Sequence, residues 1–311
     1  MRESWIEELI DGGAPLSNDT RVNGISFDRN GILWGNVSRV QHALFNFSPA
    51  NSTFNIFDIS EAIPEPEYYS ENLGYSDIVI DNSGNVYFGS YEYGVIGYQP
   101  SSNTFAKVVG GENQGNLSDD YITTLALDNN NQLWAGTTDG LCIENMGAEG
   151  SWLIHNTNTK FYSNNITQIK HNPNNNMIAI GTMNGGLVTY SDDLFNIYYS
   201  TNSDILDNSI LDVTFDNNNN VIMCTPQAGM GVFTQNGSWI WFNTINSELP
   251  TNSLKNVVVD SNNNLWITTL EDGLIQYKNN TFYTYNTENS DLPDNQINTI
   301  SICVDTILWG I

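Results

Sequence analysis

Apolar and polar positions alternate along this chain in short runs. The run Val86–Gly89 follows a turn-like stretch rich in Asn, Ser and Gly, Asp81–Asn85, which in turn follows an earlier apolar run. Turn residues of this kind between two β-branched or aromatic runs predict a hairpin. No stretch of helical periodicity reaches about a dozen residues, so we expect an all-β fold.

The pattern repeats from one end of the chain to the other. Residues 122–134 recur with small changes at 254–266 and at 22–34. A period of about 45 residues is typical of propellers and solenoids. The aromatic or apolar residue near the start of the second run recurs at seven positions: Trp34, Tyr87, Trp134, Ala179, Ile222, Trp266 and Trp309.

Each repeat predicts four short strands. The third opens with Gly and two small or apolar residues, and these strands are expected at 94–98, 140–143, 186–190, 231–234 and 273–277. The fourth has an aromatic residue at its second position, and these strands are expected to begin at Thr53, Thr104, Ser151, Leu194, Ser238 and Thr281. Seven four-stranded repeats predict a seven-bladed β-propeller that forms a single domain over residues 1–311.

The last blade draws on both ends of the chain. Residues 297–303 and 307–309 match a first and a second strand, and residues 4–9 match a fourth. We therefore expect the last blade to be closed by both termini. Its third strand has no match, which leaves open a three-stranded blade or a chain trimmed from a longer one.

The repeat resembles a known family. Leu292–Ile300, with relatives at 249–254 and 206–210, is followed by an Asp, a Leu-Trp pair and a Gly-Leu pair, and this resembles the two-component regulator propeller repeat. The resemblance covers essentially the whole chain. It implies a binding scaffold, either the extracytoplasmic sensor region of a hybrid histidine kinase, often one that senses glycans, or a surface or secreted propeller. It therefore implies a periplasmic, cell-surface or secreted location.

Charge narrows the choice of partners. The chain has 9 Lys and Arg against 35 Asp and Glu, a net charge of −26. Nucleic acid is a poor partner for such a protein, because Lys and Arg supply most of the affinity for phosphates. No run of 18 apolar residues is present, so this segment is not expected to insert into a membrane. The expected partner is a small molecule or oligosaccharide, or else a protein.

No catalytic constellation stands out. His42, His155 and His171 lie in three different repeats and are interpreted as structural or surface residues, and the cysteines, 142, 224 and 303, as buried free thiols. The turns at Asp128, Asp216 and Asp260 lack the Gly and Glu of a calcium loop and are interpreted as Asx turns.

We expect no enzyme and no cofactor, although a structural cation such as calcium stays open. The alternatives are a propeller lyase or hydrolase of the virginiamycin-lyase type, acting at the central channel, and a secreted or surface protein-interaction scaffold.

Ligand is expected where the first strands line a central channel. The third position of the first strands is mostly polar, which predicts a ring at the channel mouth: Gly24, Asp77, Thr124, Gln168, Asp212, Asn256 and Thr299. Loops beside it offer Tyr91, Tyr93, Asp139, Asn184 and Asp272. Aromatic rings beside Asp and Asn suit sugars. The competing interpretations are a ring that holds only channel water and an ordinary polar surface.

Overall fold

The computed structural model describes residues 22–38, 40–65, 67, 73–108, 117–145, 151–297, 299–303 and 306–310. Their regular elements are β-strands, in agreement with the alternation of short apolar runs. The chain divides into two compact units, Met1–Ile154 and His155–Ile311.

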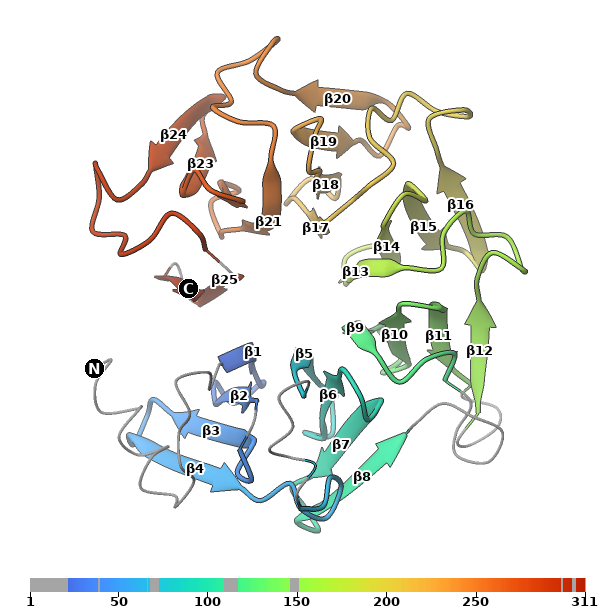
Figure 1. Cartoon of the computed structure of the whole chain (residues 1–311), viewed down its shortest axis with the longest axis vertical. Helices are drawn as coiled ribbons and strands as arrows, with labels where there is room; N and C mark the ends of the chain where they lie inside the picture. The colour runs from blue at the N-terminus through green and yellow to red at the C-terminus, as the bar shows by residue number, and fades with distance from the viewer. Residues whose placement is uncertain are drawn as a thin grey trace. The chain divides into compact units, whose positions relative to one another are not determined.

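The first unit holds three four-stranded antiparallel sheets (Figure 1). In each sheet the strands lie side by side in chain order, so consecutive strands form hairpins. The strands are β1 (Val22–Phe27), β2 (Leu33–Val37), β3 (Leu44–Ser48), β4 (Thr53–Phe57), β5 (Tyr75–Ile80), β6 (Val86–Ser90), β7 (Val95–Gln99), β8 (Thr104–Val108), β9 (Ile122–Leu127), β10 (Leu133–Thr137), β11 (Gly140–Glu144) and β12 (Trp152–His155).

The second unit repeats this arrangement three times and ends in a two-stranded sheet. Its strands are β13 (Ile166–Asn172), β14 (Met177–Thr182), β15 (Leu187–Ser191), β16 (Leu194–Tyr198), β17 (Asp212–Phe215), β18 (Val221–Cys224), β19 (Met230–Phe233), β20 (Trp239–Phe242), β21 (Leu254–Val259), β22 (Leu265–Thr269), β23 (Leu274–Lys278), β24 (Thr281–Tyr285), β25 (Thr299–Cys303) and β26 (Thr306–Gly310).

Six four-stranded antiparallel sheets are consistent with a β-propeller. The predicted third and fourth strands of these repeats are confirmed. The seventh repeat contributes β25 and β26, and its predicted fourth strand at residues 4–9 lies outside the described residues. Seven blades, closure by both termini and a single domain over 1–311 therefore stay predictions.

An Asp closes most turns between a first and a second strand. Asp260 Oδ1 accepts hydrogen bonds from the backbone N–H groups of Asn262 at 3.0 Å and Asn264 at 2.8 Å. Between them Asn263 has φ of 64°, a left-handed conformation that asparagine tolerates. The same carboxylate bonds recur at Asp28, Asp81, Asp128 and Asp216. The predicted Asx turns are confirmed.

The left-handed asparagines also join neighbouring sheets within a unit. Asn263 Oδ1 accepts a 2.7 Å bond from the Asn217 backbone N–H of the preceding sheet. Asn131 makes the equivalent contact with the Asn82 N–H at 3.1 Å. One residue type thus closes its own turn and holds the adjacent turn in place.

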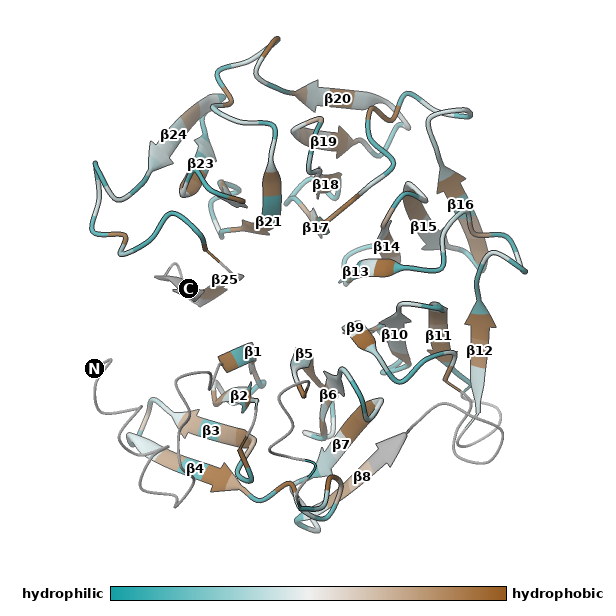
Figure 2. Cartoon of the chain, in the orientation of Figure 1, coloured by the Kyte–Doolittle hydropathy of each residue, from teal (hydrophilic) through white to brown (hydrophobic). Residues whose placement is uncertain are grey.

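Apolar side chains fill the space between sheets of the same unit. In the first unit one cluster gathers around Leu44, Phe88 and Ile96, and a second around Leu125 and Cys142. Figure 2 shows apolar residues on strands such as β11 and β15, with polar residues on many of the connecting turns. The alternation along each strand therefore reflects packing on the sheet faces.

Candidate functional site

The first sequence-predicted anchor, Asp77, links two sheets of the first unit. A register shift between Tyr75 and Ile78 interrupts the pairing of β5 with β6 at this residue, and such bulges re-aim side chains. The Asp77 carboxylate accepts a 2.6 Å bond from Thr124 Oγ1 and a 3.4 Å contact from the Leu125 N–H, both on β9. Thr124 is fully buried, so this hydrogen bond joins the two sheets in the protein interior.

Two tyrosines stack beside Asp77. The rings of Tyr91 and Tyr121 are parallel to within 1°, with centroids 4.5 Å apart. The Tyr91 ring also covers Gly74, where an added Cβ would lie 2.3 Å from a ring carbon, so any larger residue at 74 would displace the ring. Glycine at position 74 therefore leaves room for the Tyr91 ring against the backbone.

The electrostatics of this group come from burial and from its neighbours. Burial raises the pKa of the Tyr91 hydroxyl, and Tyr121 and the Asp77 carboxylate add to the effect. Tyr121 is 39% exposed, so an aromatic surface remains accessible next to a carboxylate. Stacking on such a surface together with hydrogen bonding suits a ligand with an apolar face and hydroxyl groups.

Tyr121 was not among the residues predicted from the sequence. It precedes the first strand of its repeat, where Ser209 and Ser253 stand in two other repeats. An aromatic residue at a position that is otherwise polar is the signal that could have identified it. Its partner Tyr91 is separated by 30 residues in sequence, so only the fold shows that the rings meet.

The remaining predicted residues of the first unit lie on its loops, except Gly24, which lies in strand β1. Tyr93 donates its backbone N–H to Ser90 Oγ at 2.7 Å, and burial, followed by Glu92 and Glu67, raises the pKa of its hydroxyl. Asp139 is exposed and donates its N–H to Thr137 Oγ1 at 3.0 Å. Gly24 lies in β1 and donates its N–H to Asn36 Oδ1 at 2.9 Å.

In the second unit Asp212 repeats the role of Asp77. It is only 4% exposed. One carboxylate oxygen accepts from its own neighbour Val213 N–H and the other from Val257 N–H on β21, both at 2.8 Å. The adjacent Asn256 accepts a 3.2 Å bond from Thr268 Oγ1. Asp212 and Asn256 are thereby brought near each other by contacts within the protein.

The other predicted residues of this unit also have internal partners. Gln168 Oε1 accepts from the Ile169 N–H at 3.1 Å, and Asn184, with φ of 61°, accepts from Ser209 Oγ at 2.8 Å. The exposed Asp272 donates its N–H to Thr269 Oγ1 at 2.7 Å. Thr299 is the first residue of β25, and the structure does not describe its side chain. A ligand role for these residues stays a prediction.

Histidine and cysteine side chains are the other groups with catalytic chemistry, and one of them, Cys224, pairs across the sheet with Asp212. His155 packs against Phe161 and Phe195, and burial, with a smaller effect of Lys160, lowers the pKa of its imidazole. Cys142 and Cys224 are buried free thiols, as predicted, whereas the Cys303 side chain lies outside the description. Within the described ranges no three His, Cys, Asp or Glu side chains group as metal ligands. No helix in that part of the chain is long and apolar enough to cross a membrane.

One repeat of the chain matches a known protein family. The family described as "Two component regulator propeller" matches residues 116–139. The chain carries a two-component regulator propeller repeat. This confirms the resemblance for that one repeat, which contains Tyr121, Thr124 and Asp139.

Solved structures of low sequence identity share the fold of this chain. Virginiamycin B lyase from Staphylococcus aureus matches with a TM-score of 0.72 and 12% identity over 95% of this chain and 93% of that chain. The extracellular domain of B. thetaiotaomicron BT4673, described as belonging to a hybrid two component system, matches with a TM-score of 0.63 and 12% identity over 94% of this chain and 46% of that chain. A streptogramin B lyase matches with a TM-score of 0.66 and 13% identity over 90% of this chain and 86% of that chain. No curated protein sequence matches the chain.

Proposed function

We propose that this chain is a non-enzymatic ligand-binding propeller of the extracytoplasmic sensor type. The likeness to an extracellular domain of a two-component system supports this role and a periplasmic or surface location. In this proposal seven blades form the ring, and residues 4–9 complete the last one.

The observation that carries the proposal is the Tyr91–Tyr121 stack. Its rings are parallel, Tyr121 is 39% exposed, and Asp77 lies beside them. An exposed aromatic face next to a carboxylate can stack against the C–H face of a sugar and accept bonds from its hydroxyls. We therefore propose a neutral oligosaccharide as the ligand, because the charge of −26 disfavours anions.

Calorimetry with neutral oligosaccharides and with calcium, titrated separately, tests the site. The variant Tyr121→Ser installs the residue that two other repeats carry at this position and removes the exposed ring. We expect it to abolish oligosaccharide binding and Asp77→Asn to weaken it. Tyr162→Ser, which removes a 53% exposed tyrosine of the second unit, is the matched control. Binding that survives Tyr121→Ser unchanged would overturn the site.

A lyase activity is the second candidate, because two of the similar structures are lyases. A form of the S. aureus lyase with one histidine replaced by alanine, described as catalytically inactive, was solved with quinupristin. Incubation of this protein with quinupristin, with and without magnesium, followed by mass spectrometry tests the same activity here. Turnover that is lost on replacing His42, His155 or His171 would favour this second candidate.

A further inference from the structure

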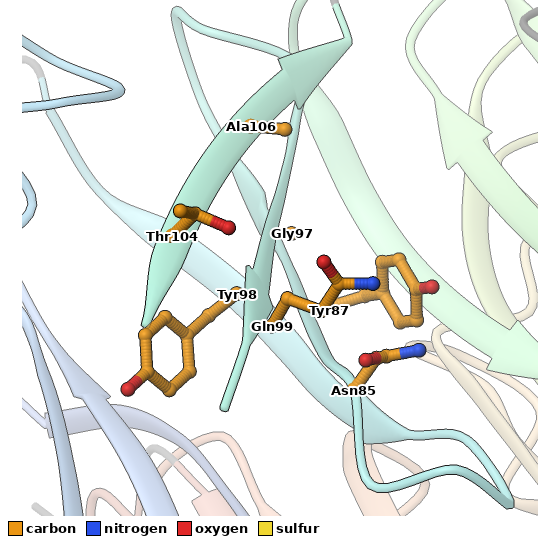
Figure 3. Close-up of a pocket in the computed structure, with 7 residues that line it drawn as sticks. All are labelled: Asn85, Tyr87, Gly97, Tyr98, Gln99, Thr104 and Ala106. Carbon is orange, nitrogen blue, oxygen red and sulfur yellow. The ribbon is translucent and has the colours of Figure 1, made fainter. Parts of the chain in front are cut away.

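A pocket of about 180 Å³ opens over strands β6, β7 and β8 of the second sheet. It is distinct from the Tyr91–Tyr121 group. Figure 3 shows the Tyr87, Gln99, Thr104 and Ala106 side chains on one side of the sheet, with Gly97 between them. None of the lining residues is charged.

The pocket exists because two large side chains are missing from one register position. Gly97 pairs with Tyr87 on one side and with Ala106 on the other. The residues at the positions of Gly97 and Ala106 in other sheets are larger, namely Asn46 with Asn55, Thr189 with Asn196, Val232 with Ile240 and Gln276 with Tyr283. The volume that these side chains fill elsewhere is therefore open in the second sheet.

Backbone geometry does not explain the glycine. Gly97 lies outside the left-handed region, and an added Cβ would meet the Tyr87 ring at 3.4 Å, an ordinary van der Waals distance. A methyl group would therefore be accommodated at this position. The glycine keeps the Tyr87 ring accessible, which is a property of the pocket and not a requirement of the strand.

The pocket is lined by the Tyr87 side chain, and carboxylates lie near it. Asn85 Nδ2 donates a 2.8 Å bond to Asp81 Oδ2. Burial raises the pKa of the Tyr87 hydroxyl, and the Asp81 and Glu144 carboxylates raise it further. Two carboxylates thus act on the hydroxyl of the tyrosine that lines the pocket.

The outer rim presents oxygen atoms. Ser102 Oγ donates to Gln99 Oε1 at 3.1 Å and lies 2.7 Å from Thr104 Oγ1. These bonds hold the Gln99 and Thr104 side chains at the mouth of the pocket. Their oxygen lone pairs are acceptors for an incoming N–H donor.

We propose that this pocket binds a small organic ammonium ion, with its alkyl part against Gly97 and Ala106 and its charged head over the Tyr87 ring. The face of an aromatic ring attracts a cation, and nearby carboxylates strengthen the attraction. An anion would meet repulsion from Asp81 and Glu144. This site does not depend on the proposed oligosaccharide function.

Titration of the full chain with n-butylammonium, followed by amide NMR at low salt, tests the proposal. The neutral probe 1-butanol has nearly the same shape. We expect saturable shifts at Tyr87, Gly97 and Gln99 and an affinity for butylammonium about fivefold higher than for butanol. Equal affinities, or no saturable shift at these residues, would overturn the proposal.

Four variants test where the ion binds. Gly97→Val fills the pocket with the residue that β19 carries at this position and should abolish binding, whereas Thr189→Val at the equivalent position of β15 should leave it unchanged. Ala106→Leu blocks the pocket from an exposed position and replaces Gly97→Val if that variant does not fold. Asp81→Asn keeps the turn, as Asn172 does in β13, and should weaken butylammonium binding but not butanol binding. Unchanged binding after the pocket is filled would show that the ion binds elsewhere.

Discussion

The buried hydroxyl of Thr124 donates a 2.6 Å hydrogen bond to the carboxylate of Asp77 on the neighbouring sheet. Asp212 makes a corresponding contact with the Val257 N–H in the second unit. Both carboxylates were predicted as ligand anchors, and both also bridge adjacent first strands.

Replacing Asp77 should destabilise the fold whether or not the residue binds ligand. Asp77→Ala leaves the fully buried Thr124 hydroxyl without this acceptor and should lower the free energy of unfolding by about 2 kcal/mol. Urea denaturation measures the change. Asp272→Ala, at an exposed loop residue, is the control and should change the value by less than about 0.5 kcal/mol. Equal effects of the two variants would show that the bridge contributes little.

Substitutions at two glycines distinguish the energetic cost of backbone strain from that of a steric clash. Gly186 and Gly237 have φ of 83° and 82°, but an added Cβ meets the Tyr198 carbonyl oxygen at 2.0 Å at Gly186 and nothing within 4 Å at Gly237. We expect Gly237→Ala to cost about 1 kcal/mol and Gly186→Ala about 3 kcal/mol or more. Chemical denaturation of both variants measures the difference. Similar costs would mean that the Gly186 turn relaxes to admit the methyl group.

Acid should weaken the turn at Asp260. Burial acts to raise the pKa of this carboxyl, but hydrogen bonds from Asn264, Trp266 and Asn262 outweigh it and hold the pKa below its usual value. A depressed pKa stabilises the fold above the unfolded value of about 3.8, and this contribution is lost as the pH falls through the folded value. The difference in unfolding free energy between the native protein and Asp260→Asn should therefore be constant above about pH 5 and shrink below about pH 4. If urea titrations show the same pH dependence for the native protein and for Asp260→Asn, this prediction is wrong.

The two described cysteines should be inert in the folded protein. Burial raises the pKa of both thiols, and at Cys142 it outweighs hydrogen bonds from Ser118. Since the thiolate is the reactive form, a Cys303→Ser variant should show no fast-reacting thiol with a disulfide reagent at pH 8. In denaturant the same variant should show rapid reaction of both thiols, Cys142 and Cys224. A rapid reaction of either thiol in the native protein would mean that its sheet opens locally.

Deletion of residues 1–10 tests the proposed closure of the last blade. If residues 4–9 form its fourth strand, the deletion should lower the thermal midpoint far more than the removal of a loose tail, because tails that are not tied down are dispensable. Thermal denaturation followed by circular dichroism measures the shift. An unchanged midpoint would show that the last blade closes in another way.

Local chemistry determined much of this protein from sequence alone. Hairpins such as β21–β22 follow from an Asx turn at Asp260 and a left-handed residue at Asn263, and both act within five residues. The repeat of these short-range signals predicted the strands, their order and the Asx turns. Buried Cys142 and Cys224 followed from their apolar surroundings.

Contacts across sheets were decided by the tertiary structure. Asp77 and Thr124 are 47 residues apart, and Tyr91 and Tyr121 are 30 apart; alternation within a strand shows which face a residue occupies but not which side chain of the next sheet meets it. For the same reason, the hydrogen bond between Asn263 and Asn217 of the preceding sheet could not be predicted from the sequence. Gly97 likewise looked like an ordinary strand residue, because a pocket depends on what all its neighbours leave unfilled.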